Sequence, residues 1–173
     1  MKNKILFKEE QRFRQWWFII LILISVVPAM MFTSYALIQQ IRGIQVGETP
    51  APIPVLAILT VFFPVLLWGY FAMKLETWVE QDGFHYRFYP LIWKNKVIAK
   101  EEIARFEIRT YNALLDYGGW GIKGSILSRK GKAYNVSGDK GLQLYLKNGK
   151  KILFGTQKPQ ALEYAMNEIM KNQ

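Results

Sequence analysis

Two long apolar stretches, residues 16–38 and 53–73, constrain the fold of this 173-residue chain more than any other feature. They are 23 and 21 residues long, and neither contains an Asp, Glu, Lys or Arg. About 20 helical residues cross the hydrocarbon core of a bilayer. The sequence therefore predicts two transmembrane helices arranged as a hairpin, with the lipid bilayer as a partner.

The distribution of charge predicts which side of the membrane each segment occupies. The net charge of +10 is carried by the first 15 residues, at +3, and by the chain from Lys74 onward, at +7, whereas the segment between the apolar stretches is neutral. Lys and Arg near the ends of spans favour the cytoplasmic side. We therefore expect a multi-pass protein of the cell (inner) membrane with both termini in the cytoplasm. The expected divisions are a basic cytoplasmic arm at residues 1–15, transmembrane helices at 16–38 and 53–73, a short extracytoplasmic connector at 39–52 and a cytoplasmic domain at 74–173.

Aromatic side chains mark the ends of the two apolar stretches. Trp and Tyr favour the membrane–water interface, because their rings are apolar and their N–H or O–H groups are polar. The residues expected to act as membrane-interface anchors are Trp16, Trp17, Tyr35, Trp68 and Tyr70.

The N-terminal arm mixes apolar residues such as Ile5 and Phe13 with lysines and arginines. Two structures fit this composition. The arm forms either a basic amphipathic helix on the membrane surface or a short flank that only sets the topology.

After Met73 the chain consists of short alternating segments separated by turns, which is typical of β-strands. Residues 75–79 and 84–89 flank Gln81-Asp82-Gly83, which predicts a hairpin. In the second of these segments Phe84, Tyr86 and Phe88 share one face. The further strands are expected at 93–99, 103–111, 117–127, 132–136, 142–146 and 151–154.

The last segment has helical rather than strand periodicity. Leu162, Ala165, Met166 and Ile169 recur at the spacing of one helix face, and Pro159 suits a first helical turn. The expected fold is therefore a membrane α-helical hairpin followed by an all-β barrel or roll. The barrel or roll would have seven or eight antiparallel strands. A C-terminal amphipathic helix would cap it, which makes the domain as a whole α+β.

This arrangement resembles the bacterial membrane-anchored pleckstrin-homology-like (bPH) proteins. The resemblance is carried by the motifs in residues 117–122, 131–144 and 148–159, and it extends over residues 74–173. It implies a PH-like barrel that binds or scaffolds partners at a membrane, in a branch of uncharacterised function. The sequence departs from phosphoinositide-binding PH domains, which gather Lys and Arg at the first hairpin, because this chain has the acidic tip Glu80-Gln81-Asp82-Gly83. Headgroup binding of that kind is therefore not expected.

No constellation of catalytic residues is recognisable. The chain has no Cys, which excludes disulfides, thiolate nucleophiles and Cys-based zinc sites. The segment Gly119–Gly124 matches G-x-G-x-x-G, but neither the helix nor the acidic residue of a dinucleotide site follows it. The only histidine, His85, is expected on the exposed polar face of its strand, without partners for acid–base chemistry or metal binding. No catalytic residue, metal or cofactor is therefore expected.

The best candidate surface for binding is basic. Lys123, Arg129, Lys130 and Lys132 lie close together in the sequence, and each basic residue near an anionic membrane adds about 1 kcal/mol of attraction. This cluster would contact a partner or anionic lipid headgroups, or would simply be a solvated loop.

These features together predict a non-enzymatic integral membrane protein whose PH-like domain interacts with, or scaffolds, an unidentified membrane or cytoplasmic protein. One alternative is an anionic-lipid-binding module that uses the basic loop. A second is a membrane-associated enzyme or enzyme subunit, which the missing Cys and lone His disfavour. Nucleic-acid binding is not expected, because no stacking-platform motif accompanies the basic charge.

Overall fold

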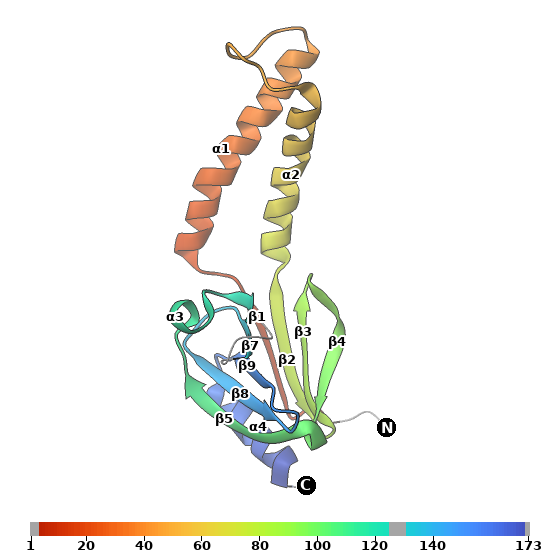
Figure 1. The fold of residues 1–173 in the computed structure, drawn as a ribbon, viewed down its shortest axis with the longest axis vertical. Helices are drawn as coiled ribbons and strands as arrows, with labels where there is room; N and C mark the ends of the chain where they lie inside the picture. The colour runs from red at the N-terminus through yellow and green to blue at the C-terminus, as the bar shows by residue number, and fades with distance from the viewer. Residues whose placement is uncertain (1–3, 125–130, 172–173) are drawn as a thin grey trace. The chain divides into compact units, whose positions relative to one another are not determined.

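The structure is a computed structural model that describes residues 4–124 and 131–171 (Figure 1). The chain forms two compact units. One contains residues 14–72, and the other combines residues 1–13 with residues 73–173. The second unit is thus built from both ends of the chain.

The unit of residues 14–72 is a pair of apolar helices. Helix α1 spans Trp16–Ile41 and helix α2 spans Ile53–Ala72, and both are long and apolar enough to cross a membrane. They lie side by side, with the ring of Phe18 5.5 Å from that of Tyr70 (Figure 1). The two apolar stretches predicted from the sequence are therefore helical, α1 being three residues longer than expected at its C-terminal end.

The other unit contains a four-stranded antiparallel sheet of order β1-β2-β3-β4. The hairpin predicted around Gln81-Asp82-Gly83 is confirmed, and Phe84, Tyr86 and Phe88 face the core as expected. Gly83 has φ +155°, and a Cβ there would meet the carbonyl oxygen of Ile98. The strands of this sheet are β1 (Phe7–Arg12), β2 (Lys74–Glu80), β3 (Gly83–Tyr89) and β4 (Ile92–Ala99).

Residues Phe7–Arg12 of the N-terminal arm form a strand, so the alternative of a surface helix is wrong for this part; a role of the arm in setting the topology stays a prediction. Strand β1 alternates between buried and exposed residues, and Phe7, Glu9 and Gln11 face the interior. It pairs with β2 in antiparallel register from Phe7 opposite Val79 to Arg12 opposite Lys74. The expectation was incomplete because the partner strand lies more than 60 residues further along the chain.

The second sheet has five strands in the order β5-β8-β9-β7-β6. Strand β7 runs parallel to β9, whereas the other neighbouring pairs are antiparallel. The eight strands described within residues 74–173 agree with the expected seven or eight, and β1 adds a ninth from the N-terminal arm. The expected fold is corrected in two ways: one pair of strands is parallel, and the two sheets do not close into a barrel. The strands are β5 (Ile103–Thr110), β6 (Gly121–Lys123), β7 (Lys132–Asn135), β8 (Lys140–Leu146) and β9 (Lys151–Gly155), and the 3₁₀ helix η1 (Lys100–Glu102) precedes them.

The strand expected at residues 117–127 is only partly covered, because residues 125–127 lie outside the described residues. In the described part, residue 117 ends a one-turn helix, α3 (Ala113–Tyr117), and Gly121–Lys123 form strand β6. The Asn112 side chain begins α3 by accepting hydrogen bonds from the backbone N–H groups of Leu114 and Leu115, both at 3.0 Å. This is ordinary N-capping by a short polar side chain.

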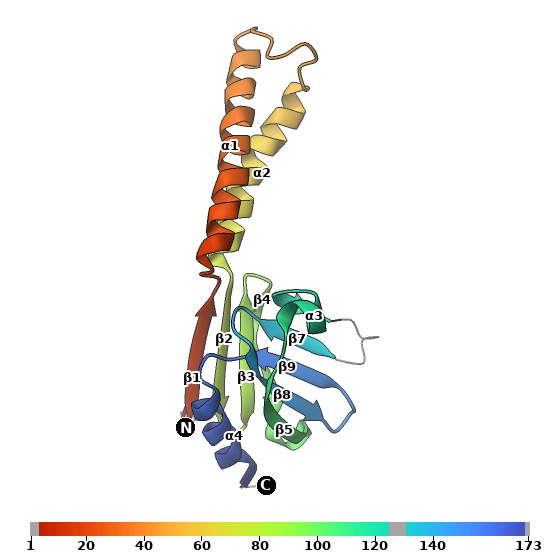
Figure 2. The same cartoon turned by 90° about the vertical axis from the view of Figure 1, so that its left-hand side faces the viewer.

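Helix α4 (Pro159–Lys171) covers one end of the core between the sheets (Figure 2). Its four apolar residues at helical spacing are all buried, as the sequence predicted. They pack into the same apolar cluster as Phe84, Phe88 and Phe154. The coarse expectation of a sheet domain followed by a packed amphipathic helix is therefore confirmed.

Candidate functional site

The most structured polar surface lies on the face of the four-stranded sheet that points away from the core, here called the outer face. Successive side chains of a strand point to opposite sides of a sheet. The residues that alternate with the core residues along each strand therefore lie on the outer face. Its members are Lys8, Glu10, Arg12, Lys74, Glu76, Trp78, Glu80, His85, Arg87, Tyr89 and Val97.

A chain of ion pairs crosses the middle of the outer face. The Glu76 carboxylate lies 2.6 Å from both Lys74 Nζ and Arg87 Nε, and Lys74 Nζ is also 3.4 Å from Glu10. Arg12 Nε completes the chain at 2.7 Å from Glu10. Glu76 is the most buried member of this chain of ion pairs, with only 6% of its side chain exposed.

The pKa of the Glu76 carboxyl group reflects two opposing effects. Burial alone raises it, but the hydrogen bonds and charges of Arg87 and Lys74 outweigh burial and lower the pKa to about 2. The pKa values of Lys74 and Arg87 are raised, mainly by their hydrogen bonds to Glu76. All three groups are therefore charged at neutral pH.

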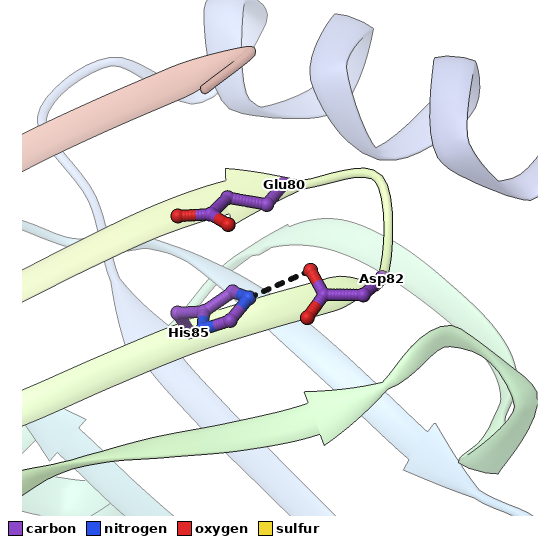
Figure 3. Close-up of side chains that lie close together, drawn as sticks. All are labelled: Glu80, Asp82 and His85. Atoms are coloured by element: carbon purple, nitrogen blue, oxygen red, sulfur yellow. Dashed lines mark hydrogen bonds and ion pairs between the residues drawn. The ribbon is translucent and has the colours of Figure 1, made fainter. Parts of the chain in front are cut away.

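A second polar group lies at the hairpin end of the outer face. Glu80 ends β2, Asp82 lies in the turn and His85 lies on β3, and Figure 3 shows their side chains converging. His85 Nε2 is 2.9 Å from Asp82 Oδ1. One ligand atom of each residue lies within 4.8 Å of the others, which is close enough for all three to hold one metal ion.

Trp78 contacts two members of this group. It stands directly opposite His85 in the strand register, and the two rings stack with centroids 5.2 Å apart and planes 18° from parallel. The indole Nε1 donates to Glu80 Oε1 at 3.0 Å. One side chain thus orients both the imidazole and a carboxylate.

The expectation that His85 is an exposed strand residue without partners is wrong. The residue is 7% exposed and contacts both Asp82 and Trp78. Alternation correctly placed it on the face opposite the core, but the large Trp78 ring covers much of that face locally. Glu80, Asp82 and His85 are the potential functional residues that sequence reasoning missed. The available signal was an acidic turn whose Asp82 lies three residues before the only histidine.

Buried hydrogen bonds join the N-terminal strand to the end of the second sheet. The Thr156 hydroxyl donates to Glu9 Oε2 at 2.6 Å, and the Gln157 backbone N–H donates to Glu9 Oε1 at 2.8 Å. Gln11 Nε2 donates to the Gly155 carbonyl at 2.7 Å. Because Glu9 and Gln11 are buried, this contact makes β1 an integral part of the fold.

The predicted basic cluster is only partly covered by the structure. Lys123 is half-buried in β6, and Lys132 is exposed at the start of the neighbouring strand β7. Arg129 and Lys130 lie outside the described residues. A lipid- or partner-binding role for this cluster therefore stays a prediction.

The five predicted interface anchors differ in exposure. Trp16, Trp17, Tyr35 and Trp68 are between 46% and 73% exposed on their helices, whereas Tyr70 is only 6% exposed and packs against Phe18. Their role at a membrane interface stays a prediction.

Comparison with known proteins gave no relative from which a function could be carried over. No protein-family model, curated protein or solved structure matches this chain.

Proposed function

We propose that this chain is a non-enzymatic, multi-pass membrane protein that presents a PH-like interaction module on the cytoplasmic side of a bacterial cell membrane. Helices α1 and α2 form its membrane hairpin. The module consists of β1 together with everything from β2 to α4, and it binds or scaffolds a protein partner.

The pairing of β1 with β2 supports the hairpin part of the proposal. Strand β1 immediately precedes α1 and β2 immediately follows α2, and Arg12 is paired with Lys74. The chain therefore leaves the sheet and returns to it at neighbouring strand ends. A segment that does so while containing two apolar helices is expected to cross the bilayer twice, with both termini on one side. The basic charge at both ends favours the cytoplasm as that side.

The order of elements supports a PH-like module. A four-stranded antiparallel sheet is followed by a second sheet and then by a C-terminal helix that packs against the core. The resemblance to bPH proteins implies two apolar spans followed by a series of strands and a closing helix, and the elements from α1 to α4 have that order.

Strand β4 carries the proposal of protein interaction. It is an edge strand of the four-stranded sheet, and five consecutive residues from Trp93 to Val97 are exposed. Trp93 is 72% exposed and Val97 is 48% exposed. An exposed edge with apolar side chains is a typical place for another chain to add a strand. Lys94 and Lys96 on the same strand act against unspecific edge-to-edge pairing.

The topology can be tested with single cysteines, because the natural chain contains none. We expect a membrane-impermeant maleimide to label Glu48→Cys in intact cells. Ile5→Cys and Tyr164→Cys, both at exposed positions, should be labelled only after permeabilisation. Labelling of either of these two in intact cells would refute the proposed orientation.

The interaction can be tested by photocrosslinking in the native membrane. A photoreactive amino acid at position 93 should give a specific crosslinked protein, whereas the same probe at position 164, on α4, should not. Both native side chains are more than 70% exposed, so accessibility alone does not separate them. Equal crosslinking at both positions, or none at position 93, would argue against β4 as the interaction surface.

A further inference from the structure

We propose that Glu80, Asp82 and His85 form a binding site for a divalent transition-metal ion, with Zn²⁺ as the preferred ion. The proposal rests on the geometry of the β2–β3 hairpin and does not depend on the interaction role of the protein.

The first argument is the convergence of three ligand atoms. A carboxylate oxygen from Glu80, one from Asp82 and a ring nitrogen of His85 lie within 4.8 Å of one another (Figure 3). Zn–N and Zn–O bonds are about 2.0–2.2 Å long, so binding of an ion would draw the three ligand atoms together by side-chain rotation. The two-residue turn Gln81-Asp82 produces this convergence, because it brings the end of β2 beside the start of β3.

The second argument is that the ligands are already oriented. The imidazole of His85 is held by stacking on Trp78, and the Glu80 carboxylate is held by the indole N–H. Outer contacts of this kind fix the ligands of metal sites in proteins. The imidazole therefore loses little freedom when it binds an ion, since the His85 side chain is only 9% exposed.

The donor set indicates the class of ion. One imidazole nitrogen and two carboxylate oxygens suit Zn²⁺ and its first-row neighbours, whereas Mg²⁺ and Ca²⁺ prefer oxygen ligands alone. Asp82 has a side chain that is 48% exposed, so the site is open to solvent. Three protein ligands with an open position leave room for water or a ligand from a partner.

The composition of the chain makes this proposal unusually simple to test. The sequence contains one His and no Cys, so no other side chain offers the nitrogen or thiolate ligand that tight Zn²⁺ binding requires. Titration calorimetry of the tag-free, full-length protein in detergent micelles with ZnCl₂ should show one site per chain. MgCl₂ under the same conditions should show much weaker binding.

Substitutions of the ligands should weaken Zn²⁺ binding at least about 10-fold, the lower limit for disturbing even an outer contact of a metal site. The variants are His85→Gln and Asp82→Asn; the second keeps the proposal testable if the buried histidine cannot be replaced without unfolding. Asp139→Asn is the matched control, because Asp139 is an exposed turn residue in the other half of the unit. It should bind Zn²⁺ like the natural protein.

A further variant tests whether Trp78 orients the ligands without binding the ion itself. Trp78→Phe keeps an aromatic ring against His85 but removes the donor to Glu80, so affinity should fall while one site per chain remains. The proposal is overturned if the natural protein binds no Zn²⁺, if Asp82→Asn binds it unchanged, or if Mg²⁺ binds equally well.

Discussion

Replacing Glu76 by Gln should destabilise the sheet in a manner that depends strongly on pH. The carboxylate is nearly buried between Lys74 and Arg87, and its pKa is lowered from 4.5 to about 2. At 1.36 kcal/mol for each pKa unit, this lowering corresponds to about 3 kcal/mol of stabilisation of the folded state at neutral pH. Gln keeps the shape and one acceptor but loses the charge. We therefore expect Glu76→Gln to cost about 2–3 kcal/mol at pH 7.

The sign of the pH dependence follows from the direction of the shift. A lowered carboxyl pKa stabilises the folded state above the pKa of the unfolded chain, and this stabilisation is lost as the pH falls toward the folded-state value. The difference between the natural protein and Glu76→Gln should therefore be constant above about pH 5. It should shrink steadily between pH 5 and the folded-state pKa of about 2.

The assay is urea unfolding of the full-length protein in a non-ionic detergent, followed by tryptophan fluorescence at a series of pH values. Glu10→Gln is the matched control, because Glu10 belongs to the same chain of ion pairs but its side chain is 39% exposed. Exposed pairs contribute about 0.2–1 kcal/mol. A difference for Glu76→Gln that is unchanged between pH 7 and pH 3, or an equal cost for Glu10→Gln, would refute the reasoning.

Three further predictions concern the packing of the same unit and use the same unfolding assay at pH 7. Met166→Ala should cost about 2–5 kcal/mol, because this side chain of α4 is fully buried in the core and its removal leaves a cavity; a cost below 1 kcal/mol would show that α4 is loosely packed. Thr156→Val should cost about 1.5–3 kcal/mol, because it removes a hydroxyl donor from the buried Glu9 carboxylate, and no loss would mean that this bond does not hold β1. Gly83→Ala should cost about 1–3 kcal/mol more than Gly149→Ala, because both glycines have positive φ but only the Cβ at position 83 meets backbone atoms; equal costs would contradict this.

Features encoded over short stretches of sequence could be predicted well. The hairpin at Gln81-Asp82-Gly83 follows from turn residues between alternating segments, and the structure places it there. Helix α4 follows from apolar residues at helical spacing, and all four of them are buried. Each of these patterns lies within about a dozen residues and reflects the period of a single element.

Features that join distant segments could not be predicted. Nothing near Phe7–Arg12 indicates that its partner is the strand beginning at Lys74. Strand β7 pairs with β9 in parallel, and the alternation of apolar and polar residues does not indicate which strands pair. Periodicity tells which side of a strand is apolar, but it does not tell which strand lies beside it.

The candidate metal site illustrates the same limit at the level of side chains. The acidic tip and the lone histidine were visible in the sequence, and alternation put His85 on the correct face. Its burial depends on the ring of Trp78, which lies opposite it only in the folded register. The sequence by itself determined the two apolar helices, the hairpin and the amphipathic helix, because each is specified by neighbouring residues. Only the tertiary structure decided that the N-terminal arm completes the sheet and that Glu80, Asp82 and His85 converge, because both depend on cross-strand register and packing.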